Sequence, residues 1–178
     1  MPMSSSSPQL RLATLADVPL LLRLGIDTFK GAFAAQNTTS DMAVYLQQTF
    51  TEAQVAAEVA HSANQFYLLT DQQGEVAGYC KLNFHQQPEK MPNANLMKIS
   101  RFYLLQTHVG QRGLAQAMMD FVLDMGRRRH CSGAWLTVWQ QNPRAVRFYE
   151  KNGFATFGVT HFTLGETVQD DFMMVKLF

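Results

Sequence analysis

Residues 135–154 read WLTVWQQNPRAVRFYEKNGF, and this stretch predicts a strand, a turn and a short helix in direct succession. The segment 134–139 is apolar and rich in aromatic and β-branched side chains, which favours a buried strand. Asn142 and Pro143 are suited to the N-cap and first position of a helix, and Gly153 is suited to its C-terminal end. The stretch therefore predicts one strand–helix unit of a mixed α/β fold.

A second strand–turn–helix unit lies upstream, where residues 106–115 read QTHVGQRGLA. The turn follows a strand predicted over 96–105 and opens a helix predicted over 113–129. Its two glycines allow consecutive backbone N–H groups to converge on an anion, and the helix N-terminus adds partial positive charge. The pattern is neither a Walker A sequence nor a Gly-x-Gly-x-x-Gly dinucleotide turn. It predicts a pyrophosphate site, with a glycine-bearing turn that binds no ligand as the alternative.

The remaining elements follow from hydrophobic periodicity and turn residues. Asp17 is suited to cap the first helix, and residues 85–95, with two prolines, predict a loop. Helices are predicted over 16–34, 41–50 and 51–62, and strands over 9–14, 65–70, 76–84, 154–163 and 170–177.

Length and composition indicate one globular domain over residues 9–178, after a disordered lead at 1–8. The formal net charge of +1 gives no overall field for binding nucleic acid or a charged membrane. No apolar run approaches the ~20 residues that span a bilayer, and the N-terminus MPMSSSSP does not resemble a secretory signal. We therefore expect a cytoplasmic protein, with Cys80 and Cys131 as free thiols.

The helix pattern Asn142-x-x-Ala-x-x-Phe148-Tyr149-x-x-x-Gly153-Phe resembles the second coenzyme motif of the GNAT superfamily of N-acetyltransferases. The turn at 106–115 falls where that family has its first motif. The similarity covers about residues 9–178, and the segments 28–51 and 158–177 resemble the bacterial spermidine/spermine N-acetyltransferase-like branch. The resemblance implies an α/β (α+β mixed sheet) fold. Its central sheet would be mostly antiparallel, with about seven strands, helices on both faces and a splay at the coenzyme site.

The turn departs from the family pattern Gln/Arg-x-x-Gly-x-Gly/Ala. If Gly113 and Ala115 anchor the match, Gly110 takes its first position. If the strand at 101–105 anchors it, the turn holds one extra residue and Val109 takes that position. We favour the second register because the strand match is close.

The resemblance also implies acetyl-CoA as co-substrate, no metal, and direct attack of a primary amine on the thioester. Tyr149 would give a proton to the departing thiolate, since a phenol is neutral at pH 7. A backbone N–H of Leu104 or Leu105 would hold the carbonyl oxygen, and Asn142 would contact the pantetheine arm. The coenzyme-binding residues expected are Tyr103, Leu104, Leu105, Gly110, Gln111, Arg112, Gly113, Leu114, Ala115, Asn142 and Phe148.

The general base stays open, because residues 98–100 hold no carboxylate where many relatives place a Glu. A water chain, Ser100 or a backbone carbonyl are the candidates. His108 is either exposed or a phosphate contact. The acids that could attract a cationic acceptor such as a polyamine are Asp27, Asp41, Asp170 and Asp171.

Two alternatives concern function. The domain could bind acyl-CoA as a sensor without turnover, or acetylate a protein or peptide amine instead of a small one. The expected partners are acetyl-CoA and an amine acceptor, with no nucleic acid and no membrane. An edge strand near the C-terminus is suited to pairing in a homodimer.

Overall fold

The computed structural model describes residues 7–111 and 113–178. Most of the predicted disordered lead, residues 1–6, lies outside this range. Arg112, one of the predicted coenzyme-binding residues, also lies outside the described residues.

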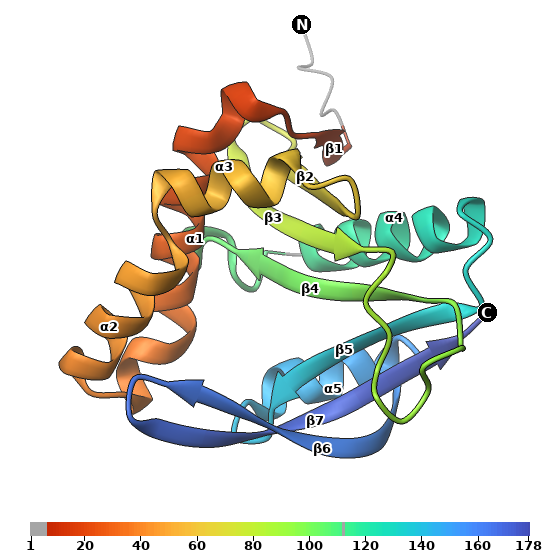
Figure 1. The fold of residues 1–178 in the computed structure, drawn as a ribbon. Coiled ribbons are helices and arrows are strands. Elements are labelled where there is room, and N and C mark those ends of the chain that lie inside the picture. The colour runs from red at the N-terminus through yellow and green to blue at the C-terminus, as the bar shows by residue number, and fades with distance from the viewer. Residues whose placement is uncertain (1–6, 112) are drawn as a thin grey trace, which may run out of the picture.

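Seven strands form one open, mixed sheet in the order β1-β2-β3-β4-β5-β7-β6 (Figure 1). Only the β4–β5 pair is parallel, and every other pair is antiparallel. The strands are β1 (Gln9–Leu12), β2 (Asn64–Thr70), β3 (Val76–Asn83), β4 (Leu96–Leu104), β5 (Gly133–Trp139), β6 (Ala155–Leu164) and β7 (Thr167–Leu177). This topology confirms the predicted fold class.

Helices cover both faces of the sheet, as predicted. Alternation along β2 separates the two cores, because Phe66 and Leu68 pack on the side of α1–α3, whereas Tyr67 and Leu69 pack on the side of α4. The helices are α1 (Val18–Phe33), α2 (Thr39–Thr49), α3 (Glu52–Ala60), α4 (Leu114–Arg128) and α5 (Pro143–Lys151). Short 3₁₀ turns occupy Leu15–Asp17, Ala34–Gln36 and Gln106–His108.

Asp17 occupies the N-cap position of α1, as predicted, but its side chain does not cap the helix. Residues 15–17 form a 3₁₀ turn, so α1 begins at Val18, and Asp17 makes no side-chain capping bond to it. The Asp17 carboxylate instead accepts a hydrogen bond from the Thr14 backbone N–H at 2.8 Å and pairs with Arg11 at 2.6 Å. It therefore closes the turn between β1 and α1.

Strand β4 contains the irregularity that opens the sheet. Lys81 of β3 pairs with Arg101 and Leu82 pairs with Ile99, so Ser100 is an extra residue, a β-bulge. On its other side β4 pairs with β5 only from Leu96 to Lys98. Beyond that point the two strands separate, as Figure 1 shows. The predicted splay is thus present.

Both cysteines are free thiols, as predicted. Cys80 is buried in β3, and burial raises the pKa of its thiol to about 12. Cys131 is half-buried after α4. Across the described ranges, no helix is long and apolar enough to cross a membrane.

Candidate active site

Two cavities fill the splay between β4 and β5. The larger, about 470 Å³, is the turn-side cavity; it lies between the end of β4, the 106–115 turn and the start of α5. The smaller, about 240 Å³, is the hairpin-side cavity and includes Ser100, Arg101, Phe162 and Asp171. The two cavities share the lining residues Ala32, Phe102, Tyr103, Trp139, Asn142, Ala145 and Tyr149. They therefore meet beside α5, between the ends of β4 and β5.

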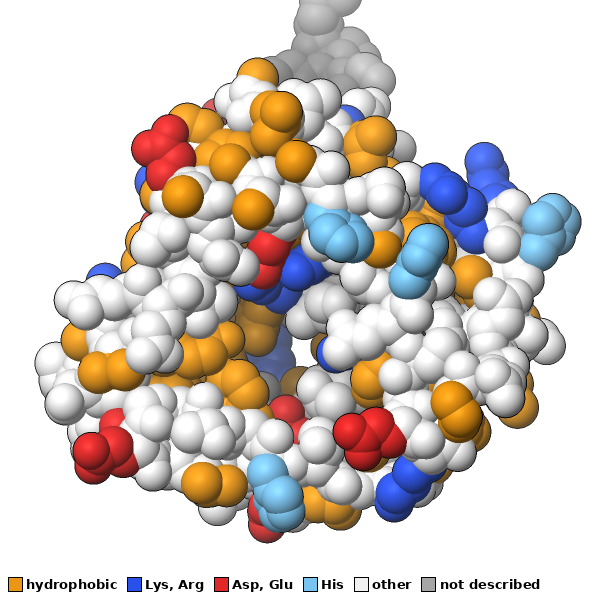
Figure 2. Space-filling view, in the orientation of Figure 1, with side chains coloured by type: hydrophobic (Ala, Val, Ile, Leu, Met, Phe, Trp, Pro, Cys, Tyr) orange, Lys and Arg blue, Asp and Glu red, His pale blue; other side chains and the backbone are white. Residues whose placement is uncertain are grey.

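A third cavity of about 350 Å³, the entrance cavity, shares Thr137, Phe162 and Asp171 with the hairpin-side cavity. It extends to residues 86–90 of the loop before β4. Figure 2 shows a deep hollow between the N-terminal helices and the β6–β7 hairpin, with basic side chains inside it. The splay is thus accessible from this face of the molecule.

The backbone of β4 offers one of the two predicted carbonyl-binding donors. The Leu105 N–H donates to the Ala77 carbonyl at 2.8 Å, so it faces β3 and is already used. Because N–H groups alternate between the two edges of a strand, the Leu104 N–H faces the opposite side, where β5 has diverged. Leu104, and not Leu105, is the donor that faces the splay.

The 106–115 turn has the left-handed backbone that its glycines permit. Gly110 and Gly113 have φ values of +88° and +87°. Gly113 is the N-cap of α4, and the Ala117 N–H makes the first helical bond, to the Gly113 carbonyl at 2.8 Å. The N–H groups of residues 114–116 therefore have no partner within the helix, which suits them to an anion.

The side chains of this turn make different contacts. Gln111 Nε2 donates to the Thr107 carbonyl at 3.1 Å, so its side chain folds back onto the turn. Val109 lines the turn-side cavity, which fits the register anchored on the strand. His108 is neither exposed nor free, because its side chain is 14% exposed and its Nε2 lies 3.3 Å from Asp71 Oδ2. The expectation of an exposed His108 was wrong, because it anchors the turn to the β2–β3 hairpin.

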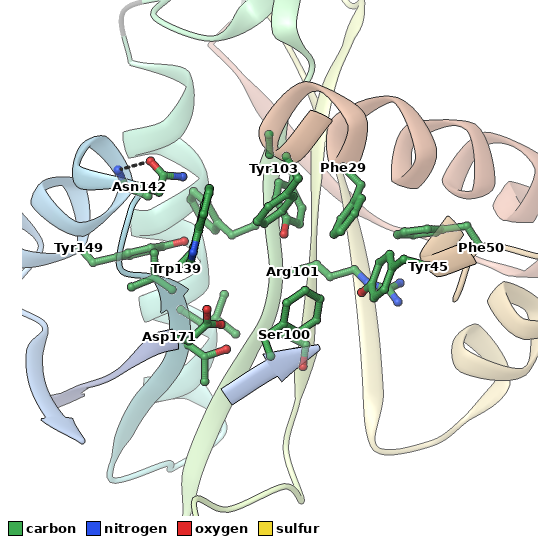
Figure 3. Close-up of a pocket in the computed structure, with 18 residues that line it drawn as sticks. Phe29, Tyr45, Phe50, Ser100, Arg101, Tyr103, Trp139, Asn142, Tyr149 and Asp171 are labelled. Carbon is green, nitrogen blue, oxygen red and sulfur yellow. Dashed lines mark hydrogen bonds between the residues drawn. The ribbon is translucent and has the colours of Figure 1, made fainter. Parts of the chain in front are cut away.

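Asn142 caps α5, as predicted. Its Oδ1 accepts a hydrogen bond from the Ala145 N–H at 3.1 Å (Figure 3). Its Nδ2 has no hydrogen-bond partner in the described part of the chain. Because Asn142 lines both cavities, this amide remains available for a further partner.

Tyr149 lies where the cavities meet. Its ring packs edge-on against Phe102, Phe148 and Phe154, with centroids 5.6–6.2 Å apart. Only 8% of the residue is exposed, and the hydroxyl makes no hydrogen bond to another described residue. Burial raises the pKa of the phenol well above its usual value. The hydroxyl is therefore neutral near pH 7 and free to donate.

A half-buried ion cluster lies beside the hairpin-side cavity and contributes Arg101 to its lining. Arg101 donates two hydrogen bonds to the Glu58 carboxylate, at 2.7 and 3.1 Å, and Lys81 lies 3.2 Å from the same group. Arg101 also stacks over the Phe50 ring at 5.0 Å. Lys98, in the entrance cavity, lies 4.8 Å from the Trp135 ring centroid, and no ion pair involves it within the described ranges. The inner wall of the hollow therefore carries more positive than negative charge.

Of the four acids considered for a cationic acceptor, only Asp171 lines the cavities. Asp27 is exposed on α1. Asp41 is buried and accepts hydrogen bonds from the Glu166 N–H and the Thr167 hydroxyl, so it fixes the β6–β7 turn to α2. Asp170 is exposed and pairs with His161 at 2.8 Å.

Several lining residues have no signal in the sequence. Arg144 lies on the exposed side of α5, and its Nη2 would be 3.6 Å from a Cβ placed on Gly110, so it reaches the glycine turn. Helix α1 contributes Thr28, Gly31 and Ala32 to one wall of the turn-side cavity, and the 3₁₀ turn after it contributes Gln36. Neither contribution follows from a local pattern, because both depend on how α1 and α5 pack across the splay.

Comparison with known proteins gives one consistent family. A model of the acetyltransferase (GNAT) family matches residues 31–154. An uncharacterized N-acetyltransferase in the pepI 3' region of Lactobacillus delbrueckii subsp. lactis is 34% identical over 160 residues, 90% of this chain and 91% of the relative.

Two solved structures share the fold at 18% identity. The PaiA N-acetyltransferase of Thermoplasma acidophilum, in complex with coenzyme A, has a TM-score of 0.77 and covers 97% of this chain and 100% of its own. The spermidine N-acetyltransferase of Vibrio cholerae, in complex with CoA and spermine, has a TM-score of 0.70 and covers 96% and 95%.

Proposed function

The chain belongs to the acetyltransferase (GNAT) family and is an N-acetyltransferase, and on that premise we propose that it transfers the acetyl group of acetyl-CoA to a small primary amine. The observation that carries this proposal is the meeting of the two cavities at Tyr149. A donor in one cavity and an acceptor in the other would bring thioester and amine together at that residue.

The turn-side cavity fits acetyl-CoA. Unpaired N–H groups at the start of α4 and the nearby Arg144 suit the pyrophosphate. The free amide of Asn142 suits the pantetheine arm, which is rich in carbonyl groups. The Leu104 N–H, exposed by the splay, suits the thioester oxygen, whose negative charge grows in the transition state.

The chemistry then requires a neutral amine and a protonated leaving group. The amine nitrogen attacks the thioester carbonyl, and the tetrahedral intermediate collapses with loss of the CoA thiolate. A thiol has a pKa near 8.5 and a phenol near 10, so a buried neutral Tyr149 holds its proton until the thiolate forms. We assign Tyr149 as the general acid that protonates this sulfur.

The charges around the cavities favour an acceptor that carries one ammonium group over a polyamine that carries several. Arg101 and Lys81 share one carboxylate, and Lys98 pairs with none within the described part of the chain. These cations would repel the additional charges of a polyamine. A polyamine and a peptide amine that enters through the entrance cavity are the other two acceptor classes, and turnover measured on each distinguishes them from a small amine.

The proposal is tested by mixing the purified chain with acetyl-CoA and a panel of amines. The panel contains a polyamine, amino acids, an aminoglycoside and a peptide N-terminus. Release of CoA and the mass of the acetylated product are followed for each. We expect steady-state turnover with at least one small primary amine, and weaker turnover with the polyamine.

Two outcomes would contradict the proposal in different ways. Tight binding of acetyl-CoA without turnover on any amine would favour a sensor that only binds acyl-CoA. Turnover restricted to peptide or protein amines would keep the activity and remove the small-molecule acceptor.

A further inference from the structure

We propose that Asp171 of β7 is the counter-ion and general base for the acceptor amine. This inference rests on the proposed function. It assigns the general base, for which strand β4 provides no carboxylate at residues 98–100. Asp171 joins the hairpin-side and entrance cavities, because it lines both. Figure 3 shows it in the cavity whose walls also carry Ser100 and Tyr149. An amine that enters from the surface would therefore pass this carboxylate before it reaches the thioester.

The Asp171 carboxylate is buried without an ion-pair partner, and the Thr137 side chain is the neighbour that stabilises its charge. The residue is 8% exposed, and its Oδ1 is inaccessible and has no hydrogen-bond partner. No cation of residues 7–111 or 113–178 lies within ion-pair distance of it. A buried charge is normally paired, so a counter-ion is missing from the protein itself. An acceptor ammonium in the cavity would supply it.

The other buried or half-buried acids near the site are occupied. Glu58 is held by Arg101 and Lys81. Asp41 binds the β6–β7 turn, and Asp71 binds the β2–β3 turn and His108. Each of these carboxylates has a structural role that proton transfer would disrupt. Within the described residues, Asp171 is the buried carboxylate that lines the cavities and has no such role, whereas Glu89 of the entrance cavity is exposed.

The surroundings suit Asp171 to accept a proton near neutral pH. Burial raises the pKa of its carboxyl to about 6, the Thr137 side chain opposes this rise, and the adjacent Asp170 adds to it. From β6, His161 faces Asp170. The other charged or titratable groups around its two cavities are Arg101, Lys98, Glu89, Lys90, Tyr45, Tyr103 and Tyr149. A base works best when its pKa lies near the working pH.

The proton balance is complete without a further reactant. The acceptor ammonium gives one proton to Asp171, and the neutral amine forms the C–N bond while the C–S bond breaks. Tyr149 gives its proton to the sulfur, and the nitrogen, which becomes an amide, loses its second proton. Solvent takes up the proton held by Asp171 and Tyr149 is reprotonated, so one ammonium and one thioester yield one amide, one thiol and one free proton.

The test compares Asp171→Asn with the matched control Asp170→Asn, a carboxylate one residue away whose side chain is 58% exposed. With an amine that the wild-type chain acetylates, kcat/KM is measured from pH 5 to pH 10, and CoA affinity is measured alongside. We expect Asp171→Asn to lower kcat/KM at pH 7 by about 100-fold or more. Asp170→Asn should stay within about fivefold of wild type. CoA affinity should be unchanged in both variants.

The pH profile separates a base from a merely structural carboxylate. The wild-type kcat/KM should rise through about pH 6 and then level off. The Asp171→Asn profile should instead keep rising about tenfold per pH unit toward the amine pKa near 10.4, because only the neutral amine reacts. Two results would overturn the assignment. One is that the kcat/KM of Asp171→Asn at pH 7 equals that of the wild-type chain, and the other is that its kcat/KM is lower but follows a pH profile of the wild-type shape.

A second variant keeps the test valid if Asp171→Asn does not fold. Thr137→Val removes the side chain that opposes the raised pKa, so the rising limb of the profile should move to higher pH. A limb that stays in place would count against Asp171. If the wild-type chain acetylates no amine at all, it is the proposed function that fails, and the two failures are thereby distinguished.

Discussion

Asn142 accepts the Ala145 N–H through its Oδ1 at 3.1 Å, while its Nδ2 has no partner among the described residues. The two atoms of one amide therefore have different tasks. The oxygen caps α5, and the nitrogen is left for the coenzyme. Capping and coenzyme binding, both expected from the sequence, can be separated by experiment because they use different atoms.

Asn142→Asp should keep the cap and lose the donor. Aspartate is as good an N-cap as asparagine, so thermal stability should be nearly unchanged. The KM for acetyl-CoA should rise roughly 2–10-fold, which is the effect of about one hydrogen bond. Asn142→Ala should show the same rise and also lose about 1 kcal/mol of unfolding free energy. An unchanged KM in both variants would restrict Asn142 to capping.

Tyr149→Phe should lower kcat about 100-fold or more and leave acetyl-CoA affinity nearly unchanged. The hydroxyl makes no hydrogen bond to the described residues, so its removal should not destabilise the fold. Tyr67→Phe is the control, because the Tyr67 hydroxyl bonds Gln65 and lies outside both cavities. Parallel losses of kcat and CoA affinity in Tyr149→Phe would contradict the proton-donor role.

Gly113→Ala tests the anion turn. Gly113 has a φ of +87°, and no atom lies within 4 Å of the point that an alanine Cβ would occupy, so the cost is backbone strain of about 1–2 kcal/mol and not a clash. Relief of that strain would shift the N–H groups at the start of α4. The KM for acetyl-CoA should rise, whereas the KM for acetyl-pantetheine, which lacks the pyrophosphate, should change little.

Equal effects of Gly113→Ala on both donors would indicate that the turn does not contact phosphate. Gly74→Ala provides the control, since Gly74 has a φ of +86°, also with open space around it, and lies in the β2–β3 turn. It should lose similar stability and leave both KM values unchanged.

Local signals in the sequence predicted most of the fold. Asn142 caps α5, as its position indicated. The errors arose where a side chain had two possible uses. The Asp17 carboxylate closes a 3₁₀ turn instead of making a capping bond to α1. Helix α2 begins at Thr39 because Thr38, and not a later residue, caps it.

The site was only half predictable, for a physical reason. The donor side depends on a turn and a helix that are continuous in sequence, so Gly113, Asn142 and Tyr149 could be named in advance. The acceptor side is assembled from α1, α3, β4 and β7, which are far apart in the chain. Asp171 therefore looked like one surface acid among four, and its burial follows only from the β5–β7–β6 order and the splay.

Glu58→Gln should destabilise the chain strongly. The Arg101 guanidinium is mostly buried and relies on the Glu58 carboxylate for two hydrogen bonds. Removal of one partner of a buried pair typically costs about 3–5 kcal/mol, because it leaves the other charge unpaired. Urea unfolding should show this loss, and the matched change Asp124→Asn, which breaks the exposed pair with Arg128, should cost less than about 1 kcal/mol. Similar values for the two variants would mean that the buried pair is not structural.

Asp171→Asn should stabilise the fold, and more at neutral pH than in acid. The folded-state pKa of Asp171, about 6, lies above its ordinary value of 3.8, so the folded chain binds this proton more tightly than the unfolded chain. The wild-type chain therefore loses stability from this group as pH rises from about 4 to about 6.

The asparagine variant does not titrate, and so it avoids that loss. Its Tm should approach the wild-type Tm below pH 3.8 and exceed it above pH 7, by roughly 2–4 °C for each kcal/mol gained. Titrations elsewhere cancel in this difference, because both proteins share them. A Tm difference that does not vary with pH would show that the carboxylate titrates normally, and a lower Tm for the variant at every pH would show that the charge is paired in the folded chain.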